Sequence, residues 1–209
     1  MTLNAPRSAS EERNHLQLTL KSSLIGKFSG ILQRGFAFKA RLGVSISSFL
    51  CDNLALSPKY VQERIATIFL DGKTVDSIET AFLREGAILA LSSAMPGLAG
   101  ATLRRDGPYA SLRDSITYRE GKVKNSIEEG LITIKLFNLL IEELGPLFLE
   151  KGIIVKSSEL RDFLAEQRDE FRQGCGDILF DGEVLEYGTF LSGNRPAENE
   201  EVELTVVTG

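Results

Sequence analysis

The chain is poor in the residue types on which many catalytic, metal-binding and secreted proteins depend. Its 209 residues include one histidine, His15, which argues against a Ser–His–Asp triad and against a multi-histidine metal site. The two cysteines, Cys51 and Cys175, are too few for a disulfide framework and favour a reducing compartment. Cys51 is typical of a small buried residue. Cys175 lies between two glycines and is either a turn residue or the better nucleophile candidate.

Long apolar runs and a strong net charge are also missing. Charged residues and a proline interrupt the most apolar segment, 131–152, whereas a membrane span needs about 20 largely apolar residues. Residues 1–14 lack the apolar core of a signal peptide, and we predict that they are disordered. The net charge of −5 gives no general attraction to nucleic acid or to anionic membranes. The expectation is a cytoplasmic protein that binds neither.

No nucleotide-binding signature is present. The sequence has neither a Walker loop nor a G-x-G-x-x-G motif, and no residue cluster with the spacing of metal ligands. We therefore expect no cofactor and no metal ion, and the sequence offers no set of catalytic residues.

One pattern occurs twice along the chain. Each copy contains an apolar run that meets an Asp-Gly turn, IFLDG at 68–72 and ILFDG at 178–182. Asp-Gly readily adopts the positive φ angles of a tight turn. Alternating apolar residues follow at 88–91 and 202–206, which predicts a further strand in each copy.

The repeat extends upstream of these turns. Each copy has two apolar segments and then a serine-capped amphipathic helix that ends at a proline or glycine. These segments are 16–21, 35–40 and 45–56 in the first copy, and 131–136, 152–157 and 157–171 in the second. The connections between the first two segments are too long for a two-residue hairpin, and either can hold an inserted helix.

The order of strand, strand, helix, strand, Asp-Gly turn and strand resembles the β-grasp fold of ubiquitin-like proteins. The segment 178–209 is more similar to the sulfur carriers of thiamine and molybdopterin synthesis. The resemblance implies an α+β chain of two tandem β-grasp units, 15–103 and 129–209, joined by a basic linker or extension, 104–128. It also implies a carrier C-terminus at Gly209, although Thr208 stands where carriers have a first glycine. The alternative is that Gly209 is simply the end of a strand.

Glycines followed by arginines form a second candidate site between the two copies. Backbone N–H groups and guanidinium groups in such a segment can bind a phosphate or a carboxylate, and a solvated basic surface is the alternative. The residues concerned are Gly97, Gly100, Arg104, Arg105, Tyr109 and Arg113.

These observations favour a non-enzymatic interaction or scaffold protein. Its sheet edges would bind a protein partner or a second copy of the chain, and we expect a homodimer. A sulfur carrier acting through Gly209, or a binder of small anionic ligands at Arg104 and Arg105, are the alternatives.

Overall fold

The chain forms an α+β structure that divides into two compact units. The computed structural model describes residues 13–94, 97–105, 107, 118, 128–192, 197 and 200–209. Unit 1 contains residues 31–143, whereas unit 2 combines residues 12–30 with 144–209. Most of the segment 1–14 predicted to be disordered lies outside the described residues, as does most of the predicted linker 104–128.

The described residues of unit 1 form five strands of mixed direction in the order β4-β3-β5-β6-β2. The central neighbours β5 and β6 are parallel, and the remaining pairs are antiparallel. The first Asp-Gly turn is confirmed, because Asp71 and Gly72 connect β3 to β4 with φ angles of 51° and 77°. The strands are β2 (Phe36–Arg41), β3 (Thr67–Leu70), β4 (Lys73–Thr74), β5 (Ile88–Ser92) and β6 (Glu129–Phe137).

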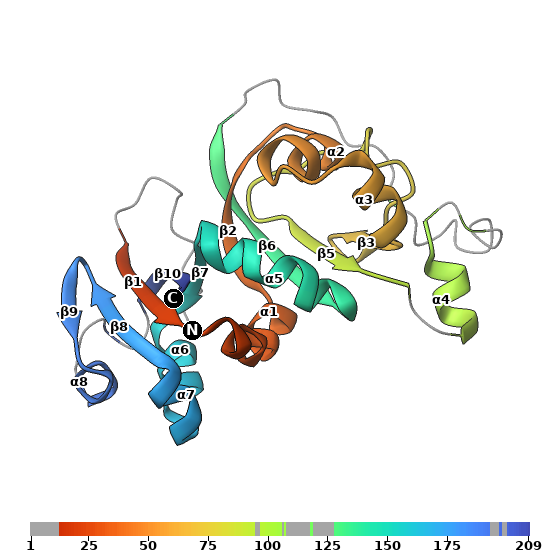
Figure 1. The fold of residues 1–209 in the computed structure, drawn as a ribbon. Helices are drawn as coiled ribbons and strands as arrows, with labels where there is room; N and C mark the ends of the chain where they lie inside the picture. Colours follow the sequence, from red (N-terminus) through yellow and green to blue (C-terminus); the bar gives the residue numbers. More distant parts are fainter. Residues whose placement is uncertain are drawn as a thin grey trace, which may run out of the picture. The chain divides into compact units, whose positions relative to one another are not determined.

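Short helices cover one face of the unit 1 strands (Figure 1). The segments α2 (Ile46–Ser48) and η2 (Phe49–Asn53) follow each other directly, and the Ser45 hydroxyl accepts a hydrogen bond from the Ser48 amide at 3.1 Å. Phe49 is fully buried, and its ring lies edge-on to Phe38 of β2 with centroids 6.2 Å apart. α3 (Pro58–Arg64) begins after its cap Ser57, and α4 (Gly97–Leu103) follows β5.

Unit 2 repeats this arrangement with the order β7-β10-β1-β8-β9. Its parallel pair is β1 and β10, and its other neighbours are antiparallel. The second Asp-Gly turn is also confirmed, with φ angles of 50° at Asp181 and 84° at Gly182. The strands are β1 (Asn14–Leu20), β7 (Ile153–Lys156), β8 (Cys175–Phe180), β9 (Glu183–Leu185) and β10 (Glu201–Thr208).

Aromatic residues form much of the helical layer of unit 2. The Phe28 ring of η1 (Ser22–Phe28) lies 4.7 Å from that of Phe163 in α6 (Ser157–Ala165). Phe171 of α7 (Asp169–Gly174) completes the cluster, with ring centroids 6.3 Å from Phe28 and 6.0 Å from Phe163. α8 (Tyr187–Ser192) follows β9.

Both long connections contain helices, as their lengths indicated. α1 (Ser29–Arg34) follows η1 in the first connection, and α5 (Leu139–Lys151) occupies the second. α5 has 13 residues and is the longest helix of the described chain; none of the described helices has the length and apolar character needed to cross a bilayer.

The units differ from the contiguous ranges 15–103 and 129–209 predicted for them. β1, expected to be the first strand of the first unit, belongs to unit 2, and β6, expected in the second, belongs to unit 1. The edge strands and the Asp-Gly hairpins occupy matching places in the two strand orders. The central parallel pairs do not follow the sequence repeat, because the neighbour of β2 in unit 1 is β6 whereas the neighbour of β7 in unit 2 is β10. Because β1 and β6 have the same alternating pattern, the pattern alone does not assign them to a unit.

Candidate functional site

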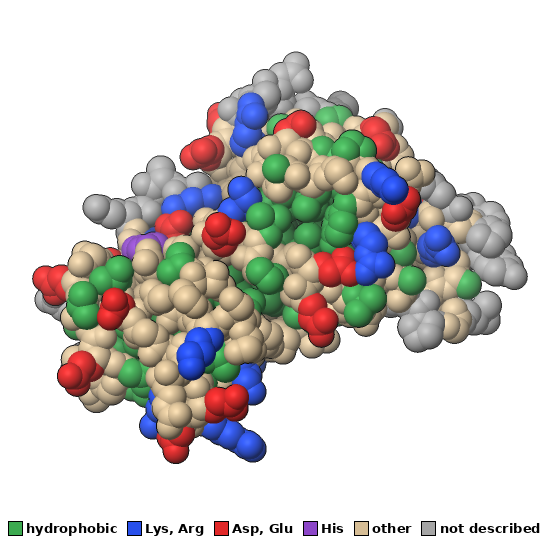
Figure 2. Space-filling view, viewed as in Figure 1, with side chains coloured by type: hydrophobic (Ala, Val, Ile, Leu, Met, Phe, Trp, Pro, Cys, Tyr) green, Lys and Arg blue, Asp and Glu red, His purple; other side chains and the backbone are tan. Residues whose placement is uncertain are grey.

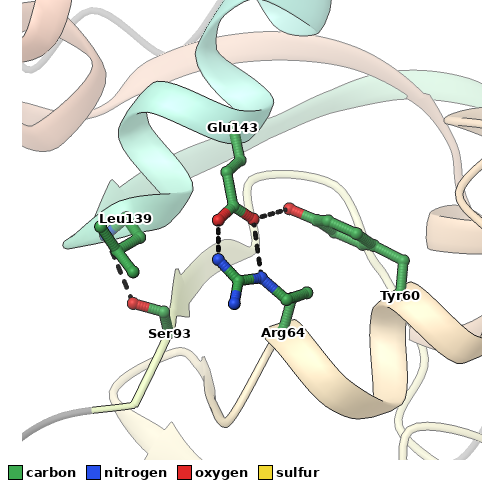
Figure 3. Close-up of polar contacts among 5 residues, drawn as sticks. All are labelled: Tyr60, Arg64, Ser93, Leu139 and Glu143. Carbon is green, nitrogen blue, oxygen red and sulfur yellow. Dashed lines mark hydrogen bonds and ion pairs between the residues drawn. The ribbon is translucent and has the colours of Figure 1, made fainter.

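Polar side chains gather at one end of the unit 1 sheet. Thr67 begins β3 and lies opposite Ser92, the last residue of β5. The Ser92 hydroxyl accepts a hydrogen bond from the Asn138 side chain at 2.9 Å. The Ser93 hydroxyl accepts one from the Leu139 amide at 3.3 Å (Figure 3). Strand pairing therefore brings together polar groups that are far apart in the sequence.

Thr67 is the exception in this polar group. It is 1% exposed, and its Oγ1 atom is buried without a hydrogen-bond partner among the described residues. Most buried side-chain hydroxyls are hydrogen-bonded, since an unsatisfied one costs about 1–3 kcal/mol. The Thr67 hydroxyl is therefore a buried donor and acceptor whose hydrogen-bonding capacity is unused among the described residues.

Thr67 lines a cavity together with residues that the sequence predicted for an anion site. This cavity, called here the small cavity, has a volume of about 180 Å³, and its wall includes Thr67, Gly97, Gly100 and Arg104. A large cavity of about 570 Å³ shares Ala66 and Arg104 with it. The arrangement places the two glycines and one arginine of the predicted site around one hollow.

The two neighbouring arginines have different roles. The Arg105 amide donates to the Ala66 carbonyl at 2.8 Å, and its Nη2 donates to the Val61 carbonyl at 3.1 Å. These bonds hold the end of α4 against α3 and β3. Arg104 is exposed and lines both the small and the large cavity. Arg104 therefore contributes to the walls of both cavities, while the bonds of Arg105 anchor it to the backbone of Val61 and Ala66.

The remaining residues of the predicted anion site do not enter this arrangement. Tyr109 and Arg113 lie outside the described residues. Arg105 lines the large cavity and a third cavity of about 330 Å³, but not the small one. Thr67 was missed by sequence reasoning, because threonine is common in strands and nothing near it in the sequence indicates a site.

Neither cysteine is a strong nucleophile in this structure. Burial, followed by the nearby charges of Asp52 and Glu79, raises the pKa of the Cys51 thiol. Burial also raises the pKa of Cys175, which is the first residue of β8 and not part of a turn. The raised pKa keeps both thiols mainly protonated at neutral pH. Their reactivity is therefore low, because the thiolate is the reactive form of cysteine.

His15 lies on the central parallel pair of unit 2, and Gly209 directly follows its strand β10. His15 is the second residue of β1, and its Nε2 lies 2.6 Å from the Thr205 hydroxyl on β10. The Gly209 amide donates to the Leu20 carbonyl at 3.1 Å, directly after the pairing of Thr208 with Leu20. The backbone at Gly209 is thus still held by the sheet, and the carrier role of Gly209 stays a prediction.

A second polar cluster, also missed by sequence reasoning, connects α3 to α5 in unit 1 (Figure 3). The Tyr60 hydroxyl donates to Glu143 Oε2 at 2.7 Å, and Arg64 donates to both Glu143 oxygens. The bond to Arg64 lowers the pKa of Glu143, and burial with the bond to Glu143 raises the pKa of Tyr60. The cluster consists of satisfied pairs, so we interpret it as a structural link.

The face shown in Figure 2 has no large patch of one charge among the described residues. Lys and Arg side chains are interspersed with Asp and Glu on the face shown in Figure 2. Among the described residues, no group of three or more His, Cys, Asp or Glu side chains is placed to hold a metal ion. None of the family models, curated proteins or solved structures compared with the chain matches it.

Proposed function

We propose that the chain is a non-catalytic binding protein whose unit 1 holds the anionic group of a small molecule in the small cavity. The observation that supports this is that Thr67, whose buried hydroxyl has no partner among the described residues, lines the small cavity together with Arg104. A hydroxyl can donate to an oxyanion, and a guanidinium group adds charge-assisted hydrogen bonds. An anion would satisfy the hydroxyl and meet a positive charge at the same place.

The other residues around the small cavity favour the same ligand class. Arg104 is the only ionisable side chain among its described lining residues, and the others are small. Gly97 and Gly100 have no Cβ, which lets a ligand oxygen approach the backbone. The volume of about 180 Å³ is below the roughly 300 Å³ at which pockets for whole small molecules begin. The cavity therefore fits one end group of a ligand.

The test is calorimetric titration of the full chain with inorganic phosphate at low ionic strength. We expect Thr67→Val and Arg104→Gln each to weaken binding about tenfold, because a hydrogen bond to a charged group contributes about 1.5–3 kcal/mol. Lys59→Gln removes the same charge from an exposed position on α3 and should leave the affinity unchanged. The proposal is refuted if phosphate does not bind, or if it binds equally well to the Thr67 and Arg104 variants.

We also propose that both units are β-grasp variants. The support is a mixed sheet with one parallel pair in each unit, an Asp-Gly hairpin at one end of each strand order, and a short helix after the matching strands β2 and β7. An experimental structure with a different strand order in either unit would overturn this assignment.

One observation favours protein interaction as a second function. β9 pairs only with β8 among the described residues, and its Val184 side chain is 69% exposed. An open edge strand with an apolar side chain can add a strand from a partner, and we propose a homodimer through this edge. Light scattering should show a dimer that Val184→Lys converts to monomers. A wild-type chain that stays monomeric at high concentration would contradict the proposal.

A further inference from the structure

The large cavity lies beside the small cavity, and Arg104 lines both. The two hollows share Ala66 and Arg104, so the large cavity is the neighbouring space for the rest of a ligand whose anionic end is held in the small one. The large cavity has a volume of about 570 Å³, within the roughly 300–1,000 Å³ typical of small-molecule pockets. This inference rests on the proposed anion site and concerns the rest of the ligand.

The side chains around the large cavity favour a body that carries hydroxyl groups. Gln62 and Glu63 line it and are exposed at the end of α3. The glutamine amide both donates and accepts, and the glutamate accepts, which together match a ligand rich in hydroxyl groups. Glu63 also disfavours a second negative charge on the body of the ligand, and Arg105, which lines the cavity too, has its guanidinium group bonded to the Val61 carbonyl. A neutral polyhydroxyl body therefore fits these residues best.

A nucleoside body fits these residues less well. Proteins hold nucleic-acid bases mainly by stacking them on aromatic side chains. None of the described residues that line the large cavity is aromatic; its largest apolar side chain is Ile65. A base would gain little there beyond its contacts with a few polar groups.

We propose that unit 1 binds a phosphorylated sugar or polyol. The phosphate lies in the small cavity with Thr67 and Arg104, and the hydroxyl-bearing body lies in the large cavity beside Gln62 and Glu63. Phosphate suits this site better than carboxylate, because its oxygens point in several directions toward donors on different elements. A carboxylate offers two oxygens in one plane.

Calorimetry on the full wild-type chain tests the proposal with glucose 6-phosphate, inorganic phosphate, glucose, glucuronate and adenosine 5′-monophosphate. We expect glucose 6-phosphate to bind at least tenfold more tightly than inorganic phosphate, and glucose alone to give no measurable binding. Adenosine 5′-monophosphate should bind no more tightly than phosphate. Glucuronate, which carries a carboxylate on the same kind of body, should bind more weakly than glucose 6-phosphate.

Variants of the lining residues show where on the chain glucose 6-phosphate binds. Gln62→Ala combined with Glu63→Ala should bring the ratio of the glucose 6-phosphate and phosphate affinities toward one, whereas Lys59→Gln should not change it. Thermal unfolding of each variant checks that it is folded. Binding of glucose 6-phosphate that Arg104→Gln and Thr67→Val leave unchanged would place the ligand elsewhere and overturn the proposal.

The failures of the two proposals are distinguishable. If phosphate binds at Thr67 and Arg104 but glucose 6-phosphate binds no more tightly, the sugar-phosphate assignment is wrong and the anion site stands. Equal or tighter binding of glucuronate or of adenosine 5′-monophosphate also overturns the assignment. If neither phosphate nor glucose 6-phosphate binds, both proposals fail.

Discussion

Replacing Thr67 by valine is expected to stabilise the protein, although most substitutions of buried residues destabilise. The Thr67 side chain is 1% exposed, and its hydroxyl has no partner among the described residues. An unsatisfied buried hydroxyl costs about 1–3 kcal/mol, and a buried methyl group in its place contributes roughly 0.8 kcal/mol. Allowing for imperfect packing of the new methyl group, we expect a gain of about 1–2 kcal/mol in the free energy of unfolding.

Urea unfolding followed by circular dichroism measures this change, since the chain has no tryptophan for fluorescence. For a chain of this size, 1 kcal/mol corresponds to roughly 2–4 °C in the melting temperature. Ser92→Ala is a matched control, because Ser92 lies opposite Thr67 and is also buried. Its hydroxyl donates to the Ser93 carbonyl at 3.0 Å and accepts from Asn138 at 2.9 Å. Losing these bonds should destabilise by about 1 kcal/mol.

The two variants are therefore expected to change stability in opposite directions. Thr67→Val should also weaken phosphate binding, so that one substitution raises the stability of the protein and lowers its affinity for phosphate. This combination is expected at a binding site that is maintained at the expense of stability. If Thr67→Val destabilises the protein by 1 kcal/mol or more, its hydroxyl has a partner in solution. The reasoning that leads from this hydroxyl to the anion site would then be refuted.

Three further predictions concern stability and reactivity. Gly130→Ala should destabilise by about 1–3 kcal/mol in urea unfolding, because an added Cβ would overlap the Leu42 side chain and displace the Glu85 carboxylate from the Leu131 amide; unchanged stability would contradict this. Arg64 lowers the pKa of Glu143, so this carboxylate stabilises the fold above the ordinary glutamate pKa of about 4.3, and its contribution is lost as the pH falls further. The difference in stability between wild type and Glu143→Gln should therefore be present at pH 7 and shrink toward pH 3; an equal difference at both values would argue against the ion pair. Cys175 should react with Ellman's reagent at neutral pH more slowly than glutathione does, because burial raises its pKa, and a rapid burst would show an activated thiol.

The sequence predicted local features better than it predicted long-range pairing. Both Asp-Gly turns and the helices inserted in both long connections were found, because each depends on residues close together in the chain. The grouping of Gly97, Gly100 and Arg104 was predicted for the same reason. Thr67 joins these residues only through the position of β3 beside β5, which no local pattern specifies.

The placement of β1 in unit 2 follows from the segment after the strand more than from the strand itself. β1 has the alternating burial expected of any strand with one buried face, and β6 has a similar pattern. The next segment, η1, contributes Leu24 and Phe28 to the core, and Phe28 lies in the aromatic cluster with Phe163. The Lys21 amide also donates to the Gly174 carbonyl at 3.1 Å, at the junction of β1 and η1. Burial of two large apolar side chains contributes several kcal/mol to the free energy of folding. Exchanging one alternating strand for another would change this free energy by less. The connection therefore determines the unit that β1 joins, which explains why a repeat recognised from strands and turns gave two contiguous units.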